Sequence, residues 1–165
     1  MKSKDQVLLE EAYKLVYEAK KINTNHKVGG KHWGGIGDDK GNTNYVYVKN
    51  VTDAADKTIK TEMIDTRKFN KPGIAKPKNV KKYAKDMIEG KWDWEKSGPI
   101  YGDYWKGKYG AFDGNHRLAA AIKAGLKKIP FKNVGDIISK AIKNKKAGKD
   151  TEIEGIKIGV KITNK

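Results

Sequence analysis

The sequence has no cysteine, only two arginines and no long apolar run, and each shortage excludes a class of protein. Without cysteine the chain has no disulfide, no thiolate metal site and no cysteine nucleophile. No apolar run approaches the roughly 18 residues that a membrane helix needs. Residues 1–11 also lack the apolar centre of a secretory signal. We therefore expect a soluble, cytoplasmic protein without a membrane partner.

The length and composition favour one globular domain. A chain of 165 residues is of ordinary domain size and needs no covalent staple. Hydrophobic residues make up 37% of the chain, and 18 glycines bring the total into the globular range. This composition excludes wholesale disorder, although 34% charged residues predict a small core.

The charge is strongly positive, with a formal net charge of +16. All but two of the 36 basic residues are lysines, a bias that fits general solubility as well as nucleic-acid binding. The arginines, Arg67 and Arg117, are more informative, because the planar guanidinium suits bidentate recognition of phosphate.

The hydrophobic periodicity predicts an α+β fold. Apolar residues at helical spacing predict helices over 3–22, 79–89, 115–124 and 136–144, the last of them capped by Asp136. Strands are expected over 45–48, 59–64, 99–104, 109–112, 129–131 and 152–162, with a loop over 23–44. We expect a core over 59–134, an N-terminal helix and hairpin extension over 1–58, and a C-terminal helix and strand over 135–165 that complete the same domain.

The most informative segment runs from Tyr109 to Leu126. A predicted strand ends at Phe112, Asp113 and Gly114 form a turn, and a helix begins at about Asn115. The first N–H groups of a helix have no partner within it, and its dipole attracts an anion. Gly114 allows that anion close to the backbone, and the next two side chains are His116 and Arg117. The segment predicts a phosphate cradle; alternatively, Asp113 only caps the helix and the cations are solvated.

Residues 113–121, Ala124-Gly125-Leu126 and Ile129-Pro130 together resemble the signature of the ParB/sulfiredoxin superfamily. The resemblance covers about 59–134 and implies a small mixed sheet with packed helices. It implies that nucleotide phosphates are held by the run Gly114, Asn115, His116 and Arg117. It also implies that Arg67 reaches the same phosphates and that Lys78 lies near a phosphate-binding lysine of the family.

Departures from that signature narrow the function. Sulfiredoxins need a cysteine where this chain has Asn115, so reduction of sulfinic acid is excluded. ParB partition proteins carry a Glu-Arg-Arg run at this turn and a helix-turn-helix domain after it. This sequence has Asn-His-Arg at the turn and few residues after it, so we do not expect a chromosome-partition protein. An Asp-Gly-x-His-Arg version resembles the small-molecule kinase branch, which implies that Asp113 serves at Mg²⁺ and the phosphates. Glu62 and Asp65 are candidate general bases, or else simple surface carboxylates.

These observations predict a nucleotide-binding enzyme that hydrolyses or transfers a phosphate of ATP or another nucleotide with Mg²⁺. His116 and Asp113 are its other candidate catalytic residues. One alternative is a DNA- or RNA-binding protein or nuclease that uses the same cradle, since residues 67–85 hold eight basic residues and no acid. Another is a non-catalytic interaction or inhibitor module.

Overall fold

The computed structural model describes residues 26–28, 31–38, 40–73 and 75–163. These residues divide into two compact units, one within 61–132 and the other formed by 26–60 and 133–163. The second unit therefore unites two segments that precede and follow the first unit in the chain. The helix predicted over 3–22 lies outside the described residues.

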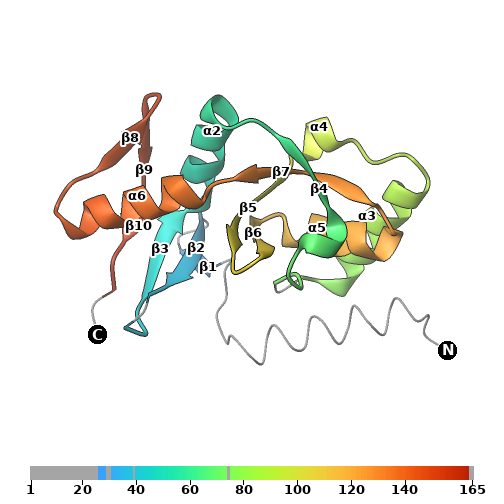
Figure 1. Cartoon of the computed structure of the whole chain (residues 1–165), viewed down its shortest axis with the longest axis horizontal. Coiled ribbons are helices and arrows are strands. Elements are labelled where there is room, and N and C mark those ends of the chain that lie inside the picture. Colours follow the sequence, from blue (N-terminus) through green and yellow to red (C-terminus); the bar gives the residue numbers. More distant parts are fainter. Residues whose placement is uncertain (1–25, 29–30, 39, 74, 164–165) are drawn as a thin grey trace. The chain divides into compact units, whose positions relative to one another are not determined.

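The fold class is α+β, as predicted, with helices packed on small sheets (Figure 1). The first unit has a four-stranded sheet of order β4-β7-β5-β6. Its elements are β4 (Glu62–Asp65), a 3-10 turn η1 (Thr66–Lys68), α3 (Pro77–Ile88), α4 (Trp94–Ser97), β5 (Ile100–Trp105), β6 (Lys108–Asp113), α5 (Asn115–Ala124) and β7 (Lys128–Asn133). β4 pairs with β7, and β5 with β6, in antiparallel fashion.

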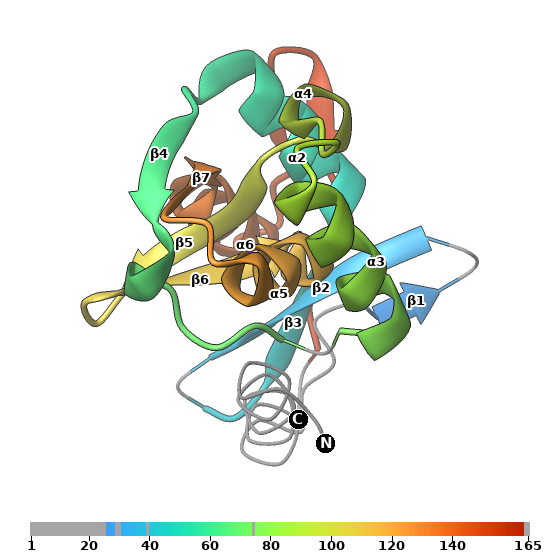
Figure 2. The same cartoon turned by 90° about the vertical axis from the view of Figure 1, so that its right-hand side faces the viewer.

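The core of the first unit lies between its sheet and helices α3 and α5. Leu118 of α5 and Phe131 of β7 are fully buried in this core. Three alanines of α5, Ala119 to Ala121, are buried as well, and such small side chains let a neighbouring helix approach closely. Figure 2 shows α3 and α5 beside the strands of this unit. The packing fixes α5, and with it the turn that precedes the helix.

The second unit has its own sheet, of order β1-β2-β3-β10. Its elements are β1 (His26–Val28), β2 (Lys31–Gly37), β3 (Thr43–Tyr47), α2 (Val48–Thr58), α6 (Gly135–Lys146), β8 (Thr151–Ile153), β9 (Ile156–Ile158) and β10 (Val160–Lys161). β8 and β9 form a separate hairpin. Among the described residues of both units, no helix combines the length and apolarity needed to span a membrane.

Several predicted elements are confirmed. Helix α5 has the predicted bounds, and α3 begins two residues before its predicted start. Gly125 ends α5 in the left-handed conformation, with φ +75°, which glycine adopts without steric cost. The strands expected before and after the turn at Lys106-Gly107 form the β5–β6 hairpin.

Other predictions are wrong in the second unit. Part of the loop expected over 23–44 is β1 and β2, because pairing with β3 overrides the weak strand preference of a glycine-rich segment. Helix α2, which buries Val51, Ala54 and Ala55, was not predicted. The single strand expected over 152–162 is three short strands, since Glu154 and Gly155 both take positive φ and turn the chain.

The predicted cap of α6 is also wrong. Asp136 does not cap this helix: the side-chain oxygen of Asn133 accepts the N–H of Gly135 instead. In α5, the apolar side chain of Ile122 is 40% exposed. It lines an open pocket at the end of α5, described below.

Candidate functional site

The turn between β6 and α5 has the geometry that the sequence predicts. β6 ends at Asp113, Gly114 has φ +97°, and α5 begins at Asn115. A Cβ on Gly114 would lie 2.8 Å from Nη2 of Arg117 and 3.0 Å from Cδ1 of Ile100. Glycine is therefore required here for its backbone conformation and for the space that Arg117 occupies.

The side chain of Arg117 folds back over this turn. Its Nη2 donates a hydrogen bond of 2.7 Å to the carbonyl oxygen of Pro99 and lies 3.9 Å from Oδ2 of Asp113. The side chain is only 17% exposed, and its Nε is buried without a hydrogen-bond partner. The guanidinium is thus held at the turn with one donor still unsatisfied.

Asn115, the first residue of α5, is buried, with 2% of its surface exposed. Its Oδ1 accepts a hydrogen bond of 2.7 Å from the N–H of Gly73. Its Nδ2 is buried and has no partner. A buried polar atom without a partner costs stability and calls for an explanation, such as a bound ligand or water.

His116 forms a second hydrogen bond to the loop before α3, the loop that contains Gly73. Its Nε2 accepts a hydrogen bond of 2.9 Å from the N–H of Lys76. Burial lowers the pKa of His116 below its ordinary value, and the positive charges of Lys76 and Arg117 lower it further. At neutral pH the imidazole is therefore uncharged, and the segment containing Gly73 and Lys76 is fastened to the first turn of α5.

Asp113 is a single carboxylate beside Arg117. Within the described ranges, no three histidine, aspartate or glutamate side chains gather into a metal-binding group. Mg²⁺ in nucleotide sites is typically held by one or two carboxylates together with phosphate oxygens. One partly exposed carboxylate at the turn fits that donor set, provided that a phosphate supplies the remaining oxygens.

Arg67 lies at the other end of α5. The N–H of the preceding Thr66 donates to the carbonyl of Lys127, which follows the helix. A helix of ten residues spans about 15 Å, so the backbone of Arg67 is far from the first turn and Arg117. The structure does not bring the two arginines to one phosphate site.

The guanidinium of Arg67 is instead held by Asp65. Its Nη2 lies 2.7 Å from Oδ2 of Asp65, whose Oδ1 also accepts the Arg67 N–H. Hydrogen bonds from Arg67 hold the pKa of the Asp65 carboxyl well below its usual range. A carboxylate of such low basicity is a poor general base.

The remaining predicted site residues lie apart. Glu62 is exposed on β4, opposite Phe131, on one edge of the sheet, whereas Asp113 ends the other edge strand, β6. Lys78 is exposed in the first turn of α3, two residues after the Lys76 amide that binds His116. Lys78 therefore begins its helix close to the turn, and Glu62 does not.

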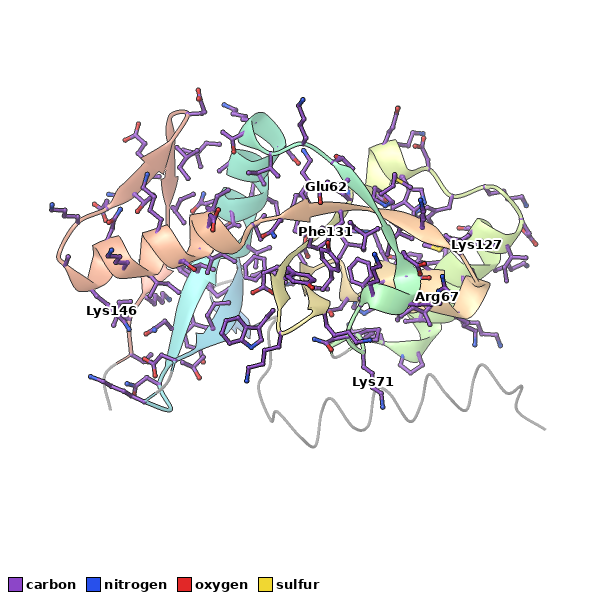
Figure 3. All side chains as sticks on the ribbon, viewed as in Figure 1. Glu62, Arg67, Lys71, Lys127, Phe131 and Lys146 are labelled. Carbon is purple, nitrogen blue, oxygen red and sulfur yellow. The ribbon has the colours of Figure 1, made fainter. Side chains whose placement is uncertain are left out.

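Sequence reasoning missed a pocket of about 820 Å³ at the C-terminal end of α5. Five basic residues line it: Arg67, Lys71, Lys123, Lys127 and Lys128 (Figure 3 labels three of them). They come from two distant segments of the chain, so no local sequence motif predicts that they lie together. The surplus of lysine is the one signal of this pocket in the sequence.

Comparisons with known proteins give one weak similarity. No family model matches the chain, and no curated protein matches it. Among solved structures, the crystal structure of sulfiredoxin from Arabidopsis thaliana aligns with 45% of this chain and 83% of that chain, at 22% identity. The TM-score of 0.33 is too low to assign a family or a function.

Proposed function

We propose that residues 61–132 form a nucleotide-binding unit of the ParB/sulfiredoxin type, and that the protein hydrolyses or transfers a nucleotide phosphate. The main support for phosphate binding is that one helical turn holds two buried hydrogen-bond donors without partners, Nδ2 of Asn115 and Nε of Arg117. Oxygens of a phosphate would satisfy both donors, and the N-terminal dipole of α5 would favour its charge.

Ligand entry would require the loop before α3 to move. Gly73 lies against Asn115: a Cβ on Gly73 would be 3.0 Å from Oδ1 of Asn115. Two hydrogen bonds, Gly73 to Asn115 and Lys76 to His116, hold this loop on the turn. Bonds to solvent-accessible loops are individually weak, and a bound phosphate would replace them with charge-assisted ones.

Movement of the loop would also prepare His116 for catalysis. With the Lys76 N–H withdrawn, Nε2 of the uncharged imidazole is free to accept a proton from an attacking water or hydroxyl. Asp113 would hold Mg²⁺, which supplies neutralisation of the charge that develops on the phosphates. Arg117 would orient the phosphate through its free Nε.

The test is nucleotide binding by two matched variants. ATP, ADP, CTP and GTP are titrated calorimetrically with and without Mg²⁺ against the parent, Arg117→Gln and Arg67→Gln. Both variants remove one positive charge, at opposite ends of α5. We expect Arg117→Gln to abolish binding and Arg67→Gln to retain it, with both variants folded by circular dichroism. Unchanged binding by folded Arg117→Gln would refute the proposal.

A further inference from the structure

The residues that line the pocket at the C-terminal end of α5 have a net positive charge. Its five basic residues face one acid, Asp65, which already pairs with Arg67. The Arg67 side chain is nevertheless 88% exposed, so the outer part of the guanidinium stays open to solvent. This lining suits a ligand with several negative charges.

The floor of the pocket is apolar. It is formed by Phe69, Pro72, Ile122 and Leu126, with Ile122 40% exposed. A small inorganic anion gains nothing from such a floor, because apolar surface is favourable only against apolar or aromatic groups. A ligand that combines charge with flat, weakly polar rings fits both parts of the lining.

The tip of the β5–β6 hairpin, which carries exposed aromatic residues, contacts the segment 67–70 that lines this pocket. Lys108 Nζ lies 3.5 Å from the carbonyl oxygen of Arg67, and the Asn70 N–H donates a 2.7 Å bond to the carbonyl of Tyr109. Trp105, which pairs with Lys108 across the hairpin, is 66% exposed, and Tyr104 is exposed as well. Figure 2 shows this hairpin turn next to the segment that follows β4.

The positive charge continues from this pocket along α5 to α3. A groove of about 540 Å³ beside α3 and α5 is lined by four lysines of α3, by one acid, Glu89, and by two apolar residues: Lys78, Lys81, Lys82, Lys85, Ala84 and Ile88. Lys123 lines both the groove and the pocket. The pocket and the groove together hold nine basic residues, five in the pocket and four more in the groove, which exceeds the charge of one mononucleotide. Eight of the nine are lysines, which contact phosphates as point charges without reading sequence.

We propose that this surface, the cationic pocket with the hairpin tip and the α3–α5 groove, binds single-stranded nucleic acid. Lysines along α5 and α3 would contact successive backbone phosphates, and Trp105 would stack on an unpaired base. Exposed rings and an apolar floor distinguish this surface from one that only follows the outside of a duplex. The pocket lies at the opposite end of α5 from the Asp113–Arg117 turn, whereas the groove extends to Lys78, near that turn. Binding at this surface does not depend on a nucleotide at the turn.

The experiment measures fluorescence anisotropy of a labelled single-stranded oligothymidylate over a range of salt concentrations. The protein is the full chain, as the parent, Lys127→Glu/Lys128→Glu, Trp105→Ala and Arg117→Gln. A charge-matched control, Lys140→Glu/Lys143→Glu, alters exposed lysines of α6 in the second unit. Circular dichroism establishes that each variant is folded.

We expect the Lys127/Lys128 variant to bind more weakly. The slope of log affinity against log salt should become less steep by about 1.4, because each of the two lost phosphate contacts contributes about 0.7 to it. Trp105→Ala should weaken binding by roughly 5- to 150-fold, the range for loss of one stacked base, without changing the slope. Arg117→Gln should bind like the parent. That result separates this surface from the turn, whose own test is nucleotide calorimetry.

Three outcomes would overturn the proposal. The first is no binding at low salt by the parent. The second is equal weakening by the Lys127/Lys128 variant and the α6 control, which would indicate attraction by net charge alone. The third is unchanged affinity in Trp105→Ala together with full competition by polyglutamate, which would identify the surface as one for acidic proteins.

Discussion

Gly73 donates its backbone N–H to Oδ1 of Asn115 across 2.7 Å, which joins the loop before α3 to the first residue of α5. The two residues are 42 positions apart in the chain. The Asn115 amide is only 2% exposed and bonds through its oxygen, so its NH₂ group is buried without a partner. This pair is the structural basis of the proposed loop movement.

The first prediction concerns that tie. Asn115→Ala removes the acceptor of the Gly73 N–H, so the loop should open more often while α3 stays intact. We expect faster hydrogen exchange at Gly73, unchanged exchange at Ala84 within α3, and a loss of about 1–3 kcal/mol in the free energy of unfolding. Unchanged exchange at Gly73 would contradict the role assigned to Asn115.

The second prediction compares two glycines of the same helix. Gly114 and Gly125 both have positive φ, but a Cβ would meet Arg117 and Ile100 at the first and nothing within 4 Å at the second. Gly125→Ala should cost about 1–2 kcal/mol of stability for its conformation. Gly114→Ala should cost about 1–3 kcal/mol more for crowding, measured by urea unfolding. Equal costs would show that the turn is not tightly packed.

The third prediction is a pH dependence from His116. Its pKa in the folded protein is lowered from 6.5, so below that value the unfolded chain binds more protons than the folded one. The free energy of unfolding should therefore fall as the pH drops below 6.5. The stability that depends on the uncharged His116 is fully present above that pH. His116→Gln should reduce this fall in urea unfolding measured on both sides of 6.5. A His116 resonance that titrates above 6.5 by NMR would contradict the lowered pKa.

The fourth prediction separates core from surface aromatics. Phe131 is fully buried, whereas Trp105 is 66% exposed. Phe131→Ala should lower the free energy of unfolding by about 3–5 kcal/mol. Trp105→Ala should change it by no more than about 0.5 kcal/mol, because it leaves no cavity. A large loss for Trp105→Ala would mean that the hairpin tip is part of the packing and not a free surface.

The sequence predicts an element correctly where its local apolar pattern and turn residues favour the same structure as its tertiary contacts. Helix α5 is predicted to the residue because its apolar stripe, Gly114 and Gly125 all mark the same bounds. β2 was missed because its strand is specified by pairing with β3 and not by its own glycine-rich residues. Long-range pairing of this kind is invisible to local periodicity.

The candidate site also has parts that local sequence predicts and parts that it does not. The turn at Gly114 is encoded within five neighbouring residues, so the sequence predicts it. The place of Arg67 depends on how η1 meets the end of α5, through Thr66 and Lys127, which no local pattern specifies. The cationic pocket likewise arises only when residues 65–72 and 122–128 come together.

Binding of a nucleotide phosphate at the first turn of α5 can be observed by NMR of the labelled side chains of that turn. On titration with ATP and Mg²⁺, we expect saturable shifts of the Asn115 Nδ2 and Arg117 Nε signals, with the Arg67 Nε signal unmoved. Shifts of Arg67 with the Asn115 and Arg117 signals unchanged would refute binding at this turn, because the nucleotide would then occupy the opposite end of the helix.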